Sequence, residues 1–254
     1  MRKESCTLLI EECEELLGQI DAKFSEAFEN PENVEVAVPK VKSFLEHCRS
    51  ILEYTAQDIF KLVVPEQERN RKLQSKKDNK VYFPYGPTKK IFRIRVSQNL
   101  PGLLSSDVQI YSLVEGIQDH KRNIERKFLT YMCRETNDNK HDDLSESQRD
   151  SIIYTQIGNM GQFGPNMSVT FENCVYNNIP TGNFSVKNGQ IQGNINPLLL
   201  SEVVQYEEGQ YVFKGTKKNV VQFLQFSLNE IKQFVDDLYK IVDDLYKILE
   251  SEYV

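Results

Sequence analysis

Residues 221–250 read VQFLQFSLNEIKQFVDDLYKIVDDLYKILE, and this stretch decides the fold. Its apolar residues recur at alternating steps of three and four, and the piece VDDLYKI at 235–241 is repeated immediately at 242–248. A period of about 3.5 residues is typical of a helix that lies along another helix. We therefore predict a long helix over 217–254, packed on the rest of the chain through its first half and available to a dimer partner through its second. The apolar positions are Val221, Leu224, Leu228, Ile231, Val235, Leu238, Val242, Leu245 and Leu249.

Two further amphipathic stretches lie near the N-terminus. Residues 4–29 and 39–64 carry apolar side chains at three- and four-residue steps, and a polar break with Pro31 separates them. Pro39 suits the first turn of a helix, and Pro65 cannot continue one. Two long helices joined by a short loop cannot bury their own apolar stripes, so further helices must cover them. The sequence predicts a helical bundle.

The segment that follows the second helix is punctuated by proline and glycine. Residues 81–83 and 91–96 are rich in β-branched and aromatic side chains, which predicts two short strand-like pieces. We expect them to belong to an excursion from the bundle over 65–106. Residues 106–119 return to a helical spacing of apolar side chains.

A fourth helix is expected over 121–137, because neither proline nor glycine interrupts that region. The asparagines and aspartates between 137 and 143 are poor in helix interiors, so we expect the helix to end or bend among them. Ser145-Glu146-Ser147-Gln148 has the form of a capping box and predicts the start of a further short helix. Residues 1–150 are therefore predicted to form the bundle together with its excursion.

The character of the chain changes between residues 151 and 216. Short β-rich runs are separated there by glycine, proline and asparagine, which favour tight turns. Glu207-Glu208-Gly209-Gln210 looks like a hairpin turn, and the whole segment predicts a small antiparallel β-insert, a meander. The runs are 152–157, 168–171, 184–186, 190–192, 203–206 and 211–213. The expected fold class is mainly α (α+β), with this insert before the long C-terminal helix.

Composition restricts the class of protein. The chain has 254 residues, of which 39% are hydrophobic and 27% charged, enough for a folded core with a well-solvated surface. No apolar run approaches the roughly 18 residues that span a bilayer, and acidic residues interrupt the N-terminal apolar stretch as no signal peptide allows. Five scattered cysteines without a CxxC pair predict reduced thiols rather than disulfides or a zinc site. We expect a soluble cytoplasmic protein with no membrane partner and no cofactor.

The net charge is −6, but the charge is unevenly distributed. Residues 66–97 carry ten cations against three anions. Such a basic patch on an acidic protein is a candidate RNA contact, and a solvated loop rich in lysine is the competing interpretation. The candidate contacts in this segment are Arg69, Arg71, Lys72, Lys89 and Lys90.

Three histidines, His47, His120 and His141, are the candidates for acid–base chemistry. If a helix persists through 134–141, Arg134, Asn137 and His141 share one of its faces. An imidazole can move a proton near neutral pH, and a guanidinium can hold a phosphodiester, so the pair suits RNA cleavage by its own 2′-hydroxyl. The competing interpretation is a helix end capped by asparagine and aspartate, with lysine and histidine facing water.

The sequence resembles the HEPN superfamily, whose members are helical bundles in which four to six residues separate an arginine from a histidine near the last core helix. Arg134 and His141 have six residues between them. It is most similar to a group of uncharacterised bacterial HEPN-like proteins, over roughly residues 8–150. The similar pieces are Val41-Lys42-Ser43-Phe44-Leu45, Arg49-Ser50, Glu53-Tyr54, Tyr82-Phe83-Pro84, Glu115-Gly116-Ile117-Gln118 and the Asn-x-Asn-Lys-His box of residues 137–141.

The resemblance implies a dimer-forming bundle and, in active members, an arginine–histidine pair that cuts RNA without a metal. Such proteins serve as toxins or in defence against phage. Carried over to this chain, the catalytic pair would be Arg134 and His141, with Asn137 and Lys140 as phosphate contacts. The residue after the arginine departs from the usual pattern, since here it is Glu135.

Other functions remain open at this point. The chain could be a non-catalytic HEPN-like module that binds a cognate protein or nucleic acid. His141-Asp142 resembles the paired ligands of helical HD phosphohydrolases, but those enzymes need more histidines than this chain offers. Neither a Gly-rich phosphate loop nor a G-x-S-x-G elbow is present in the sequence.

Overall fold

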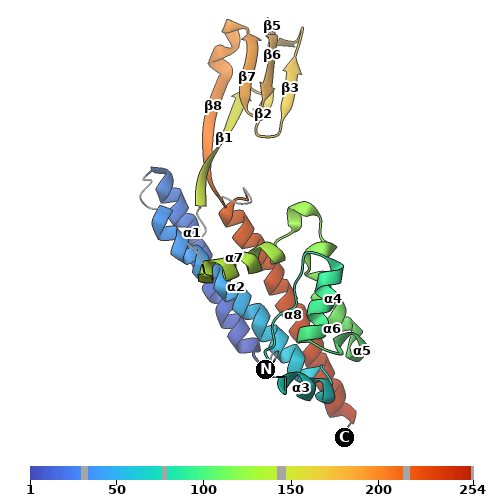
Figure 1. Cartoon of the computed structure of the whole chain (residues 1–254). Helices are drawn as coiled ribbons and strands as arrows, with labels where there is room; N and C mark the ends of the chain where they lie inside the picture. Colours follow the sequence, from blue (N-terminus) through green and yellow to red (C-terminus); the bar gives the residue numbers. More distant parts are fainter. Residues whose placement is uncertain (30–33, 76–78, 142–146, 214–217, 253–254) are drawn as a thin grey trace. The chain divides into compact units, whose positions relative to one another are not determined.

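The structure is a computed structural model that describes residues 1–29, 34–75, 79–141, 147–213 and 218–252. It divides into two compact units (Figure 1). The helical unit comprises Met1–Glu146 and Val220–Val254, and the β-unit comprises Ser147–Asn219. Helix is the predominant secondary structure and the sheets are antiparallel, so the fold is mixed α+β, as predicted.

Three long helices form the body of the helical unit: α1 (Lys3–Glu29), α2 (Val34–Leu62) and α8 (Val220–Glu252) (Figure 1). The helix predicted over 4–29 is confirmed to within a residue at its start. The second helix begins before Pro39, which therefore lies inside α2 and not in its first turn. Pro39 has no backbone N–H, so α2 lacks the hydrogen bond that this residue would otherwise donate to the carbonyl four positions earlier.

The predicted apolar stripe of α8 is buried from Leu224 to Val242, whereas its first member, Val221, is only partly buried. Leu245, one step further along, is 38% exposed. The burial of the stripe therefore decreases within the second copy of the repeat, residues 242–248. Tyr239 lies in the core as well, where its hydroxyl donates a 2.8 Å hydrogen bond to the buried Asp58 carboxylate. The backbone N–H of Arg2 donates to the same oxygen at 2.6 Å, which joins the N-terminus to α2.

The strand predicted at 91–96 is wrong, because these residues belong to α4 (Lys89–Asn99). The Thr88 hydroxyl caps this helix by accepting the N–H of Ile91 at 3.3 Å. Phe92, Val96 and Asn99 are its buried residues, at spacings of four and three. The burial of one helical face outweighs the β-propensity of Ile91 and Ile94.

Residues 81–83 do not form a strand either. Their backbone donors are taken by side chains: Phe83 N–H by the Glu53 carboxylate at 2.7 Å, and Tyr82 N–H by the Asn99 amide oxygen at 3.0 Å. Gln118 holds the next residues, donating to Pro84 O and accepting from Gly86 N–H. The segment is fixed by long-range side-chain contacts that a local pattern cannot reveal.

Shorter helices complete this unit. They are α3 (Glu66–Leu73), α5 (Leu103–Ser106), α6 (Val108–Gly116), α7 (Leu129–His141) and the 3₁₀ turns η2 (Asp119–Lys121) and η3 (Ile124–Arg126). The helix predicted over 106–119 corresponds to α6. The helix predicted over 121–137 begins only at Leu129 and continues to His141. Among the described residues, no helix is both long and apolar enough to cross a membrane.

The β-unit is organised by β1 (Ser147–Ile157) and β8 (Val203–Phe213), which pair along their whole length. The capping-box helix predicted around Ser147 is therefore wrong, and so is the hairpin turn at 207–210. Glu207 and Glu208 pair with Ile153 and Ile152 in the middle of the ladder. The two strands lie about 50 residues apart in the sequence. Because the partner strand is so distant, the turn-like composition of 207–210 does not reveal that these residues pair with β1.

The remaining strands of the β-unit are short. They are β2 (Gly161–Phe163), β3 (Ser168–Phe171), β4 (Val175–Tyr176), β5 (Ile179–Pro180), β6 (Gly182–Lys187) and β7 (Gln190–Ile195), with the turn η4 (Pro197–Glu202) before β8. The sheet orders are β2-β1-β8, β3-β6-β7 and β4-β5, so the insert is antiparallel but not a simple meander. Its core gathers Ile157, Phe163, Phe184 and Val186, and the rings of Phe171 and Phe184 stack at 4.7 Å.

Candidate functional site

The N-terminus of α7 is held by one buried carboxylate. Asp119 Oδ1 accepts the backbone N–H groups of Phe128 and Leu129 at 2.9 and 3.1 Å, and Oδ2 accepts that of Thr130 at 2.8 Å. A helix leaves its first N–H groups without partners, so this carboxylate satisfies three of them and opposes the positive end of the helix. Asp119 thereby fixes where α7 begins, eight residues after the predicted start.

α7 presents a buried face and an exposed one. Leu129, Met132, Cys133 and Thr136 are at most 1% exposed, whereas 61% of the Arg134 side chain is accessible. The Arg134 guanidinium lies over the ring of Tyr131, 5.4 Å from its centroid. Glu135 is 8% exposed, and its carboxylate oxygen Oε1 lies 4.0 Å from Arg134 Nη2.

The helix persists through the segment that carries the other predicted site residues. Asn137 and His141 follow Arg134 at the third and seventh positions of one continuous helix, so the three backbone positions fall within about 60° of one another around its axis. The side chains of Asn137, Lys140 and His141 lie outside the described residues.

A half-buried charge pair of α2 lies close to Cys133 of α7. On α2, Arg49 Nη2 and Glu53 Oε1 are 2.6 Å apart, and the Arg49 guanidinium lies 4.7 Å from the centre of the Tyr85 ring. Burial raises the pKa of the Cys133 thiol to about 11 although Arg49 lowers it. Sequence reasoning gave this pair no role of its own. The sequence does contain an indication of it, because an arginine and a glutamate four residues apart on an otherwise apolar helix face predict an ion pair.

The basic segment separates into two parts with different roles. In α3, Arg71 pairs with Glu68 at 2.6 Å, the Arg69 guanidinium donates to Lys61 O, and Lys72 is 6% exposed. In α4, by contrast, Lys89, Lys90 and two arginines that were not predicted as contacts, Arg93 and Arg95, are all exposed. In α3, Lys72 is thus buried and Arg69 contacts the backbone of α2, while the paired Arg71 side chain is still 73% exposed. The α4 cations all reach solvent.

His120 is part of a small polar cluster. Its Nε2 lies 3.4 Å from the Glu115 carboxylate, which Lys89 and Lys121 also approach at 3.6 and 3.5 Å. Burial acts to raise the pKa of Glu115, but the hydrogen bond from His120 and the two lysines bring it below its usual value. The His120 side chain is only 11% exposed and its ring packs on Phe92, although its neighbours along the chain are charged.

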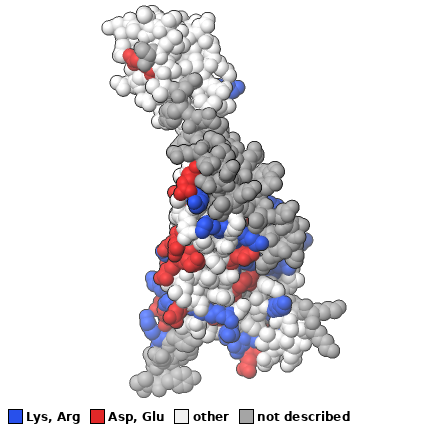
Figure 2. All heavy atoms as spheres, turned by 90° about the vertical axis from the view of Figure 1, so that its left-hand side faces the viewer, with Lys and Arg blue, Asp and Glu red and all other residues white. Residues whose placement is uncertain are grey.

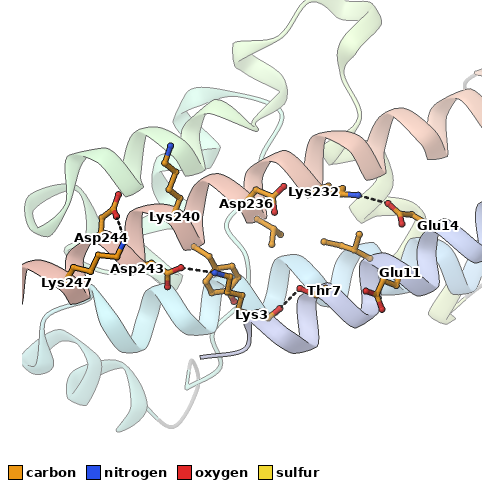
Figure 3. Close-up of a pocket in the computed structure, with 13 residues that line it drawn as sticks. Lys3, Thr7, Glu11, Glu14, Lys232, Asp236, Lys240, Asp243, Asp244 and Lys247 are labelled. Atoms are coloured by element: carbon orange, nitrogen blue, oxygen red, sulfur yellow. Dashed lines mark hydrogen bonds and ion pairs between the residues drawn. The ribbon is translucent and has the colours of Figure 1, made fainter. Parts of the chain in front are cut away.

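A groove of about 500 Å³ runs between α1 and α8 (Figure 3). Its charged side chains largely pair with one another: Lys3 with Asp243 at 2.8 Å, and Lys232 with Glu14 at 2.7 Å. On the face drawn in Figure 2, both signs of charge are interspersed over the helical unit, whereas the β-unit at the top shows few charged side chains. Neither feature offers a cluster of one charge to an RNA backbone.

The described residues contain no group of three or more His, Cys, Asp or Glu side chains arranged to hold a metal ion. The HD-type interpretation depends on His141 and Asp142, and both Asp142 and the side chain of His141 lie outside the described residues. Comparison of the chain with models of protein families, with curated proteins and with solved structures finds no match.

Proposed function

We propose that this chain is a HEPN-like endoribonuclease of the bacterial toxin or anti-phage defence type, which cleaves RNA without a metal through Arg134 and His141. The observation that carries the proposal is the unbroken course of α7 from Leu129 to His141. It aligns the two positions along one face of the helix, while Arg134 itself is exposed and its neighbours are buried.

The chemistry needs two groups. The Arg134 guanidinium would bind the scissile phosphate and stabilise the charge that develops on it. The His141 imidazole would move a proton to or from the attacking 2′-hydroxyl or the leaving oxygen. Asn137, one turn from Arg134, and Lys140 would add contacts to the same phosphate backbone. The resemblance also implies a dimer, and each copy would then carry its own Arg134 and His141.

A second candidate function rests on Glu135. Its carboxylate lies 4.0 Å from the guanidinium and can neutralise it, which suits a non-catalytic module that binds a protein or nucleic-acid partner. The Glu135→Gln substitution bears on the choice between the two candidates. In a nuclease, removing this negative charge should leave activity intact or increase it, because Arg134 then binds phosphate without competition.

The test is incubation of the purified chain with a mixed RNA pool in the presence of a chelator, followed by mapping of the new ends. We expect cyclic-phosphate ends from the parent, and a loss of at least about a hundredfold in rate for His141→Ala and for Arg134→Ala. Arg126→Ala is the matched control. Its side chain is similarly exposed, at 64%, and similarly placed over a ring, that of Phe226 at 5.5 Å.

Circular dichroism of each variant checks that the helices are intact. Cleavage that survives in His141→Ala at the parental rate would show that the activity comes from elsewhere. If neither the parent nor any variant cleaves RNA while all of them are folded, the result would favour the binding module.

A further inference from the structure

A different part of the helical unit combines positive charge with exposed apolar side chains. From Asn79 to Ser106 the chain contains no carboxylate and five exposed cations, in a protein whose net charge is −6. These cations are Lys80, Lys89, Lys90, Arg93 and Arg95. Among them lie Ile91, Ile94 and Leu104, which are 39%, 47% and 52% exposed. Exposed apolar surface that is rimmed by charged side chains is a feature of protein-interaction sites.

The same region is hollowed. A groove of about 570 Å³ lies between α4 and α5, which Figure 1 shows grouped with α6. Its first wall is one face of α4 and the turn after it, because Arg93, Val96 and Leu100 follow one another at steps of three and four. Its second wall is α5 with Leu103 and Leu104, and Tyr111 of α6 also lines it.

The floor and the rim of this groove differ in character. Val96, Leu100, Leu103 and Tyr111 are buried, at most 8% exposed, and form an apolar floor. Leu104 and Arg93 are exposed at the rim. No carboxylate lines the groove, and in the described part of the chain no ion pair engages Arg93. The neighbouring Lys89 is different, since it is drawn towards Glu115.

We propose that the α4–α5 groove binds an acidic amphipathic helix of a partner protein. Apolar side chains spaced by three and four residues would pack on Leu104 and the accessible edge of Val96, and flanking Asp or Glu residues would pair with Arg93 and Lys90. This proposal is independent of the nuclease, since it uses no residue of α7.

The chemistry of the groove favours a peptide over RNA. Single-stranded RNA binds where exposed rings stack against its bases. Among the described residues that line the groove, Tyr111 supplies the one ring, and it is only 8% exposed. An apolar floor beside a cationic rim instead matches a helix that has one apolar and one acidic face.

The experiment pans a display library of random peptides of about twelve residues against the folded full-length chain. An enriched peptide is then labelled, and its binding is followed by fluorescence anisotropy. A labelled uridine oligonucleotide of about fifteen nucleotides serves as the polyanion probe. We expect enrichment of peptides that combine Asp and Glu with Leu, Ile or Phe at spacings of three and four.

Paired variants locate the binding surface. Arg93→Glu and Leu104→Asp should each weaken the peptide by about tenfold or more. Arg95→Glu and Val108→Asp are the matched controls, because both residues are exposed and neither lines the groove. They should change the affinity by less than about threefold. Circular dichroism confirms that each variant is folded.

Several outcomes would overturn the proposal. These are failure to enrich any peptide, enrichment of neutral or basic peptides, or equal weakening by Arg93→Glu and Arg95→Glu. Binding of the oligonucleotide that both arginine variants weaken equally, and that Leu104→Asp leaves unchanged, would identify a general polyanion surface instead.

Discussion

Asp119 is the residue whose removal should most clearly loosen α7, the helix that carries Arg134. Its carboxylate is 4% exposed and accepts three backbone N–H groups at 2.8 to 3.1 Å. Asp119→Ala leaves those donors without acceptors, two of them fully buried. Asp119→Asn keeps one carbonyl oxygen in place of Oδ1 but presents an amide N–H to Thr130.

The magnitude follows from these contacts. An N-cap that accepts one or two exposed N–H groups contributes about 1 kcal/mol, and a buried donor left unpaired costs about 1–3 kcal/mol. With three bonds to a charged and buried acceptor, Asp119→Ala should destabilise the helical unit by about 3 kcal/mol. Asp119→Asn retains two of the three bonds, so it should destabilise by about 1–2 kcal/mol.

Urea unfolding followed by far-UV circular dichroism measures both variants, and the midpoints are compared at an unchanged dependence on denaturant. Ser106→Ala is a useful control, since Ser106 is exposed and its hydroxyl merely returns to Gly102 O within its own turn. The reasoning is refuted if Asp119→Ala lies within about 0.5 kcal/mol of the parent, which is the range of ordinary surface substitutions. It is also refuted if asparagine destabilises as much as alanine, since the retained oxygen would then be irrelevant.

Two further predictions concern thiols and pH. Cys174 is exposed and the other four cysteines are buried, with the pKa of Cys6 and of Cys133 raised to about 11 by burial. A disulfide reagent should therefore modify one thiol quickly in the native protein and the rest only on unfolding, and a fast phase that survives in Cys174→Ser would contradict this. Glu115 has a pKa below its usual 4.5, so its contribution to stability is present above that pH and is lost as the pH falls through the folded value. Glu115→Gln should lower the urea midpoint at neutral pH and leave it unchanged in acid, and an equal effect at both would sink the assignment.

Local sequence patterns suffice where each residue's environment repeats along its own helix. α1 and α8 match their predicted spans because their buried residues recur every three or four positions, and that period depends on nothing but the chain itself. The asparagine-rich turns of the β-unit are also predictable from local sequence. Asn166, Asn173, Asn177, Asn178 and Asn188 all adopt positive φ, which asparagine tolerates better than most residues.

The candidate site was predictable in part. The sequence places Arg134, Asn137 and His141 at helical spacing, and the helix does persist through them. That the helix starts at Leu129 depends on Asp119, and that its inner face is supported at Cys133 depends on Arg49 of α2. Contacts between different elements have no local period, so spacing alone cannot reveal them.

Only the tertiary structure shows which segments adopt a secondary structure that their local sequence does not favour, because residues distant in the chain stabilise it. α4 reads as a strand until Phe92 and Val96 are seen to bury one helical face, and 207–210 reads as a turn until β1 pairs across it. The α3 and α4 cations look alike in the sequence, and only the fold buries Lys72 while it leaves Lys90 and Arg93 exposed. In each case the deciding free energy comes from burial and pairing with residues distant in the chain, which exceed the fraction of a kcal/mol that local propensity contributes.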